Sequence, residues 1–64
     1  MSEVLYNFLK KNINKRLLFI TKGGFRYVGT VLLVDKQTVE INDRKIGNMA
    51  ISLDDILNVR RSRE

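Results

Sequence analysis

Residues 19–41 read FITKGGFRYVGTVLLVDKQTVEI, a run of apolar, β-branched and aromatic residues that is broken at only a few positions. Gly29 lies five residues after Gly24, and Asp35 lies six residues after Gly29. The Gly23-Gly24 pair predicts a hairpin turn, because glycine lacks the Cβ atom that disfavours positive φ angles. Gly29 falls inside a strand, so we expect a sharp bend there or the close approach of another backbone, which is how a short sheet curls into a barrel.

The sequence on both sides of this run continues the strand pattern. The segment Leu17-Leu18-Phe19-Ile20 predicts a first strand that is buried on both faces. We expect five strands, over residues 17–20, 25–34, 38–41, 46–53 and 56–59, separated by turns at residues 22–24, 35–37, 42–43 and 54–55. The chain is therefore expected to be mainly β, with short antiparallel strands.

A short α-helix is expected before the strands, over residues 2–12. Ser2 can cap its N-terminus, and Glu3 complements the positive end of the helix dipole. Lys10 and Lys11 lie near the negative end, where cations are favourable. Apolar residues recur at the spacing of one helical face, at Val4, Leu5, Phe8 and Leu9.

The length of 64 residues leaves room for one domain, residues 1–64, made of the helix, a barrel at about 15–59 and a basic tail at 60–64. A domain of this size buries only about 60% of the surface of its unfolded chain. The chain has no cysteine, so disulfides are excluded as a source of stability. We therefore expect oligomerisation to supply part of the stability.

The charge of the chain points to an anionic partner. Twelve Lys and Arg against seven Asp and Glu give a net charge of +5, and most basic residues are clustered, at 10–11, 15–16, 44–45 and 60–63. This pattern favours nucleic acid over a membrane surface, and the alternative is that the charge serves only solubility.

Several classes of function are not expected. The chain has no His, and its adjacent acids, Asp54 and Asp55, lie in a turn without a nucleophile or base placed to work with them, so we expect no enzymatic activity. The same inventory predicts no metal and no cofactor. The longest uncharged stretches, residues 27–34 and 46–53, are too short to span a membrane as helices, and residues 1–15 lack a signal-peptide pattern, so we expect a cytoplasmic protein.

The order of one helix and five strands resembles the Sm-like superfamily, which comprises the Sm, Lsm and Hfq proteins. Its first motif is carried by Gly24, Gly29 and Asp35, with mostly apolar residues between them. Its second motif is carried by Ile51, Ile56 and Val59 in the last strand pair. The match extends over nearly the whole chain.

The resemblance implies an SH3-like small barrel, that is, an N-terminal helix on a strongly bent, five-stranded antiparallel sheet. It also implies a ring of about six or seven copies of the chain, in which the fourth strand of one subunit pairs with the fifth strand of the next. Such rings bind single-stranded RNA as chaperones or scaffolds. We expect five apolar residues to divide between the core and the subunit interface: Ile46, Met49, Ile51, Ile56 and Leu57.

Three sets of RNA-binding residues are implied by the resemblance. The pore side would use Lys36, Gln37 and Ser52, and the opposite face would use Phe25, Arg26 and Tyr27. A basic rim that attracts phosphates without reading sequence would comprise Lys10, Lys11, Arg60, Arg61 and Arg63. The alternatives are an ordinary polar turn for the first set, packing of the Tyr27 ring for the second, and a solvated surface for the third.

Some positions depart from the family pattern and keep other functions open. Sm and Lsm proteins bind uridine with an asparagine and an Arg-Gly pair, and these positions hold Val39 and Ser52-Leu53. One alternative is therefore an Sm-like ring that has lost the uridine pocket and acts as a scaffold for protein assembly. A second alternative is a monomeric adaptor with a small SH3-like barrel.

Overall fold

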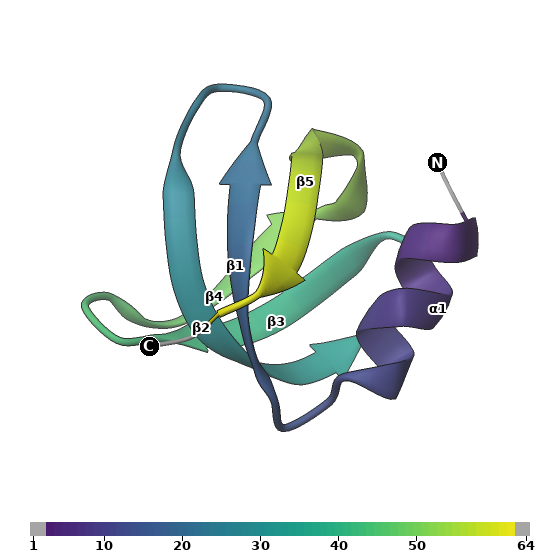
Figure 1. Ribbon diagram of the computed structural model, residues 1–64, viewed down its shortest axis with the longest axis horizontal. Coiled ribbons are helices and arrows are strands. Elements are labelled where there is room, and N and C mark those ends of the chain that lie inside the picture. The colour runs from purple at the N-terminus through teal and green to yellow at the C-terminus, as the bar shows by residue number, and fades with distance from the viewer. Residues whose placement is uncertain (1–2, 63–64) are drawn as a thin grey trace.

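A computed structural model describes residues 3–62 and shows one helix followed by five strands (Figure 1). The elements are α1 (Glu3–Lys11), β1 (Arg16–Thr21), β2 (Arg26–Val34), β3 (Thr38–Asp43), β4 (Gly47–Ser52), a single 3₁₀ turn η1 (Leu53–Asp55) and β5 (Ile56–Arg61). The prediction of an N-terminal helix and five antiparallel strands is confirmed. Ser2, the expected helix cap, lies outside the described residues.

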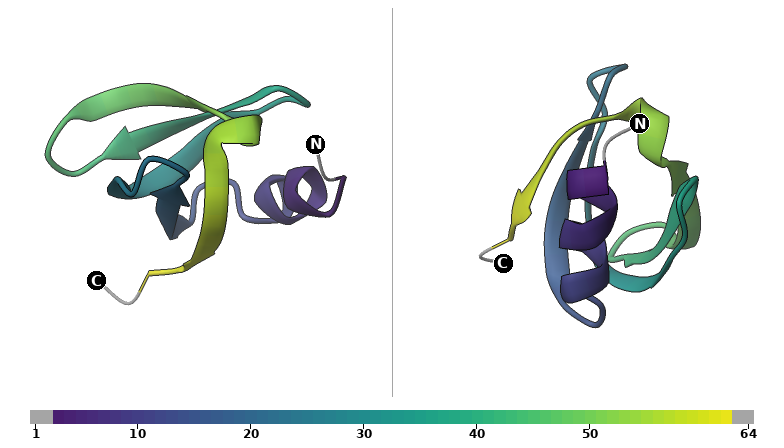
Figure 2. Two further views of the ribbon diagram at one scale, coloured as in Figure 1. Left: turned by 90° about the horizontal axis from the view of Figure 1, so that it is seen from above. Right: turned by 90° about the vertical axis from the view of Figure 1, so that its right-hand side faces the viewer.

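The five strands form one antiparallel sheet in the order β4-β3-β2-β1-β5. The sheet is open, because β4 and β5 occupy its two edges instead of pairing with each other to close a barrel. The sheet folds over into two arms, with β1 and β5 on one side and β3 and β4 on the other, and α1 crosses the end between them (Figure 2). The long strand β2 belongs to both arms, since it pairs with β1 near its start and with β3 towards its end.

Gly29 lies where β2 passes from one arm to the other. Its backbone runs so close to β3 that a Cβ atom would lie 2.8 Å from the Asn42 carbonyl oxygen and 3.1 Å from the Ile41 Cδ1 atom. The β2–β3 register then shifts between Val31 and Leu33. The expected bend with a close backbone approach is confirmed, and only a residue without a side chain fits there.

The core lies inside the folded sheet. Strand β1 alternates between buried residues, Leu17, Phe19 and Thr21, and half-buried ones, Leu18 and Ile20. The expectation that this strand is buried on both faces is therefore wrong, because its second face looks outward and is only partly covered. The buried apolar side chains are Leu9, Leu17, Phe19, Val31, Val39, Ile41, Ile51, Leu53 and Ile56.

Helix α1 closes the core from the end of the sheet. Leu9 is fully buried, and Leu5, Tyr6 and Phe8 pack against the core, whereas Val4 is 78% exposed despite its place in the apolar pattern. The helix ends where the Asn12 side-chain amide donates to the Phe8 carbonyl oxygen at 2.7 Å. Asn14 then adopts a φ of 71°, a left-handed conformation that asparagine tolerates, which turns the chain into β1.

Several boundaries differ from the sequence-based expectation. Residues 42–43 belong to β3 rather than to a turn, because the Asp43 carboxylate accepts hydrogen bonds from the Lys45 and Ile46 N–H groups and so moves the turn to residues 44–46. The turn ends at Gly47, whose φ is 96°. Residues 60–61 continue β5 instead of forming a tail, since Arg60 and Arg61 pair with β1.

The five apolar residues that were expected to divide between the core and the subunit interface fall into a buried group and an exposed pair. Ile51 and Ile56 are buried, and Met49 is half-buried against the core. Ile46 and Leu57 are 63% and 68% exposed. The exposed pair remains available to a partner.

Replacement of Gly29 by alanine is expected to lower the free energy of unfolding by about 1–3 kcal/mol, because the new methyl group overlaps a fixed backbone carbonyl. Gly23→Ala is the matched control, since its methyl group would meet the movable Phe25 ring at 3.3 Å and the Thr21 hydroxyl oxygen at 4.0 Å, but no backbone atom closer than these. Urea denaturation of both variants measures the difference. Equal stability of the two variants would contradict the role given to Gly29.

Candidate nucleic-acid interface

The turn between β2 and β3 presents the predicted pore-side residues Lys36 and Gln37. Asp35 organises this turn, because its Oδ1 atom accepts from the Gln37 N–H at 2.7 Å and from the Thr38 N–H at 2.8 Å. The Thr38 hydroxyl donates to the same atom at 3.2 Å. Lys36 and Gln37 are left exposed on a turn of fixed shape.

Ser52 lies close to this turn at the end of β4. It pairs with Thr38, and the next N–H, from Leu53, donates to the Gln37 carbonyl oxygen at 2.8 Å. The structure therefore brings the backbones of the three predicted pore-side residues together. Ser52 also borders a second hollow, described below with Phe25.

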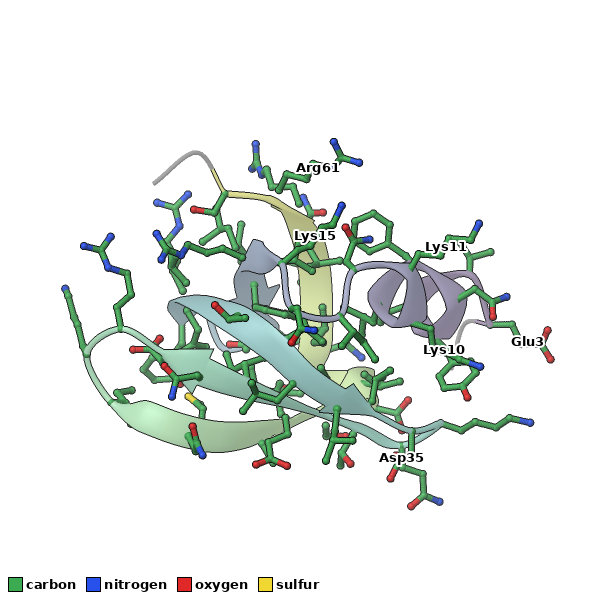
Figure 3. The ribbon with its side chains drawn as sticks, turned by 90° about the horizontal axis from the view of Figure 1, so that it is seen from below. Glu3, Lys10, Lys11, Lys15, Asp35 and Arg61 are labelled. Carbon is green, nitrogen blue, oxygen red and sulfur yellow. The ribbon has the colours of Figure 1, made fainter. Side chains whose placement is uncertain are left out.

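Helix α1 adds to the same side of the molecule. A hollow of about 160 Å³ is lined by Glu3, Tyr6, Asn7 and Lys36. The Lys10 ammonium lies 5.2 Å from the centre of the Tyr6 ring, within the range of a cation–π contact. Figure 3 shows Lys10 on the side of the helix that faces the Asp35 turn, so Lys10 lies towards the predicted pore-side residues.

The sequence does not predict that Tyr6 lies beside Lys36. The apolar periodicity of the helix selects its neighbours Leu5, Phe8 and Leu9, and nothing in the sequence links Tyr6 to a turn 30 residues later. The link depends on how α1 crosses the end of the sheet.

The predicted opposite-face set divides between two surfaces. Tyr27 pairs with the buried Phe19 and is half-buried against the core, so its ring packs, whereas Arg26 pairs with Ile20 on the outer face. Phe25 is 65% exposed beside the turn, where its N–H donates to the Thr21 hydroxyl at 3.2 Å. A hollow of about 280 Å³ brings Phe25 and Tyr27 together with one edge of the sheet; its other lining residues are Thr21, Met49, Ala50, Ile51, Ser52 and Asp55.

The predicted basic rim is not one surface either. Arg60 pairs with the half-buried Leu18, and Arg61 pairs with the buried Leu17, so the two arginines lie on opposite faces of β5. Lys11 lies on the same side of the view as Arg61 in Figure 3, and Arg63 lies outside the described residues.

Two of the three positions that depart from the uridine-binding pattern of Sm and Lsm proteins are inside the protein. Val39 is fully buried and Leu53 is 2% exposed. Neither side chain can contact a ligand at the surface, and the only exposed side chain among these three positions is Ser52.

Two carboxyl groups have lowered pKa values in this structure. Hydrogen bonds from the backbone N–H groups of Gln37 and Thr38 lower the pKa of Asp35 below its ordinary value. The N–H groups of Lys45 and Ile46 lower the pKa of Asp43 in the same way. Both groups therefore favour the charged form in the folded state.

No family model, no curated protein and no solved structure matches this chain. Within residues 3–62, no cluster of His, Cys, Asp and Glu could hold a metal ion. No helix of that part of the chain is long and apolar enough to cross a membrane.

The two lowered pKa values predict a loss of stability in acid. Their contribution is complete above the ordinary carboxyl pKa of about 4 and is lost as the pH falls through the lower pKa values of the folded state. The double variant Asp35→Asn/Asp43→Asn is expected to lose less stability than the unmodified protein between neutral pH and about pH 3. Urea unfolding at the two pH values tests this, and an equal loss in both proteins would contradict it.

Proposed function

We propose that this chain assembles through β4 and β5 into a closed Sm-like ring that binds single-stranded RNA, with about six or seven copies per ring. The observation that carries the proposal is the pair of sheet edges, since β4 and β5 have six residues each and end an open antiparallel sheet. Exposed strand edges invite pairing with another chain, and a head-to-tail contact that closes covers them all.

The finer fold belongs to the same proposal. The close approach at Gly29, the two arms around one core and the helix across their end support a strongly bent sheet of the SH3-like small-barrel type. In this arrangement the strand that completes each edge comes from a neighbouring subunit rather than from the same chain.

Apolar surface next to the β5 edge supports the assembly. A groove of about 400 Å³ lies between α1 and β5, and its lining residues are Val4, Leu5, Phe8, Ile56, Leu57, Asn58 and Val59. Val4 and Leu57 are exposed in the single chain. A strand added alongside β5 would cover Leu57 and part of this groove, which removes apolar surface from water.

The RNA-binding part of the proposal relies on two faces. On one face, Lys36 and Lys10 can meet phosphates, and the Gln37 amide and the Tyr6 ring can contact bases. On the other face, the exposed Phe25 ring borders its hollow and can stack on a base.

A second candidate function is a scaffold for protein assembly built on the same ring. It is favoured by the burial of Val39 and Leu53, since two of the positions that would form a uridine pocket are inside the core. A ring that retains neither uridine-rich nor adenine-rich RNA would support this candidate.

Assembly is expected to depend on Leu57. The variant Leu57→Glu places a charge on the β5 edge and should yield a folded monomer, because a buried unpaired carboxylate opposes strand pairing. Leu33→Glu is the matched control, since Leu33 is 64% exposed but lies on β2 inside the sheet. Native mass spectrometry reads the subunit number. A ring formed by Leu57→Glu, or a monomer formed by the unmodified protein, would overturn the assembly.

The Phe25 face and the Gln37 face are expected to bind different RNA sequences. Phe25→Ala should weaken binding of adenine-rich RNA by about 1–3 kcal/mol, the usual loss when a stacking ring is removed, and Gln37→Ala should weaken binding of uridine-rich RNA. Each variant serves as the control for the other. Fluorescence anisotropy with both RNAs gives the affinities, and the absence of salt-sensitive binding by the unmodified protein would refute the RNA function.

A further inference from the structure

Charge is segregated between the two arms of the sheet. Strands β1, β2 and β5 carry the arginines Arg16, Arg26, Arg60 and Arg61 and no acidic residue. Strands β3 and β4 carry Glu40 and Asp43 and no basic residue. The arm that contains β5, β1 and the start of β2 is therefore the basic part of the sheet.

Strand pairing places one arginine from each of β1, β2 and β5 on the outer face of this arm. Arg60 pairs with Leu18, Leu18 pairs with Val28, and these three residues form a row across the strands. Two residues after Leu18 on β1, Ile20 lies on the same face and pairs with Arg26. Two residues before Leu18, Arg16 also lies on this face and pairs with Thr30.

The turn between β3 and β4 adds a fourth arginine, Arg44, beside Val28 at the end of this row. The Arg44 N–H donates to the Val28 carbonyl oxygen at 3.4 Å. Arg26, Val28 and Arg44 line one hollow of about 360 Å³, together with Asp43 and Lys45. The Asp43 carboxylate in this hollow already accepts two backbone hydrogen bonds. We call the group Arg16, Arg26, Arg44 and Arg60 the arginine face.

We propose that the arginine face binds the phosphate backbone of nucleic acid without reading its sequence. Guanidinium groups bind phosphate through two parallel hydrogen bonds, and all four arginines are exposed. From Arg60 to Arg44 the row crosses three strand spacings, about 14 Å, so successive phosphates can be held at once. Only Arg60 of the four lies on β5, the edge strand that the proposed ring would pair, and none of the four lines the hollow beside Lys36 or the hollow beside Phe25.

Nucleic acid fits this surface better than a lipid membrane does. The apolar residues between the arginines, Leu18, Ile20 and Val28, are half-buried, so they do not protrude as membrane-inserting side chains do. Of the strongly exposed apolar side chains, Val4, Leu33 and Leu57 lie away from the four arginines in the sequence, whereas Phe25 precedes Arg26 and Ile46 shares the turn of Arg44.

The test compares two double variants that remove the same charge. Arg16→Gln/Arg44→Gln changes the arginine face at two residues that no base-recognition site uses, and Lys15→Gln/Lys22→Gln removes two exposed charges outside it. The first variant is expected to bind oligouridine and oligoadenosine about tenfold more weakly at low salt, by the same factor for both. The slope of log affinity against log salt should fall by about 1.4, because each lost phosphate contact removes about 0.7.

The outcomes separate this surface from the proposed ring. Equal losses in the two double variants would overturn the arginine face, because net charge alone would then explain binding. Loss of vesicle binding, with phosphatidylserine as the anionic lipid, but not of RNA binding would also overturn it. The folded monomer Leu57→Glu should keep the arginine-dependent part of the affinity even if ring-dependent binding is lost, and Arg60→Gln alone provides a second test if the double variant does not fold.

Discussion

The whole structure depends on the contact between Gly29 and the backbone of β3. With no side chain at this position, β2 can pass within van der Waals range of the Asn42 carbonyl and bend there. The bend lets one strand serve two arms, and the arms enclose a core that a flat sheet of this length could not form. Asp35 and Asp43 support the same geometry at the two ends of the β2–β3 pair, where their carboxylates hold the adjoining turns.

The bend also determines which strand edges remain without a partner strand. Because the two arms fold towards each other without meeting, β4 and β5 stay at the edges of an open sheet. A chain this small has few further residues with which to cover these edges, and α1 is already used to close the end of the core. Backbone groups at these edges and apolar side chains such as Leu57 therefore remain uncovered in the single chain, and the assembly proposed above is one way to cover them.

The sequence predicts local structure well where one residue carries the information. Gly29, the turn with Gly24 at a φ of 87°, and the helix followed by five strands could all be predicted, because glycine chemistry and apolar periodicity are local signals. Three contiguous residues, Phe25, Arg26 and Tyr27, were predicted as one site, but strand alternation puts Arg26 and Tyr27 on opposite faces. That Tyr6 and Lys36 line one hollow could not be predicted, since it depends on the path of α1 across the sheet.

Alternation along strands has a further consequence for the basic residues. Neighbours in the sequence, such as Arg60 and Arg61, are sent to opposite faces, whereas residues far apart in the sequence, such as Arg16 and Arg44, are brought to one surface. Clusters of basic residues in the sequence therefore overestimate the charge density of any one surface, and they do not predict the arginine face. None of the four arginines lines the hollow beside Lys36 or the hollow beside Phe25. Under the proposals above, the arginine face could therefore hold a nucleic-acid backbone while both proposed base-contacting sites stay free.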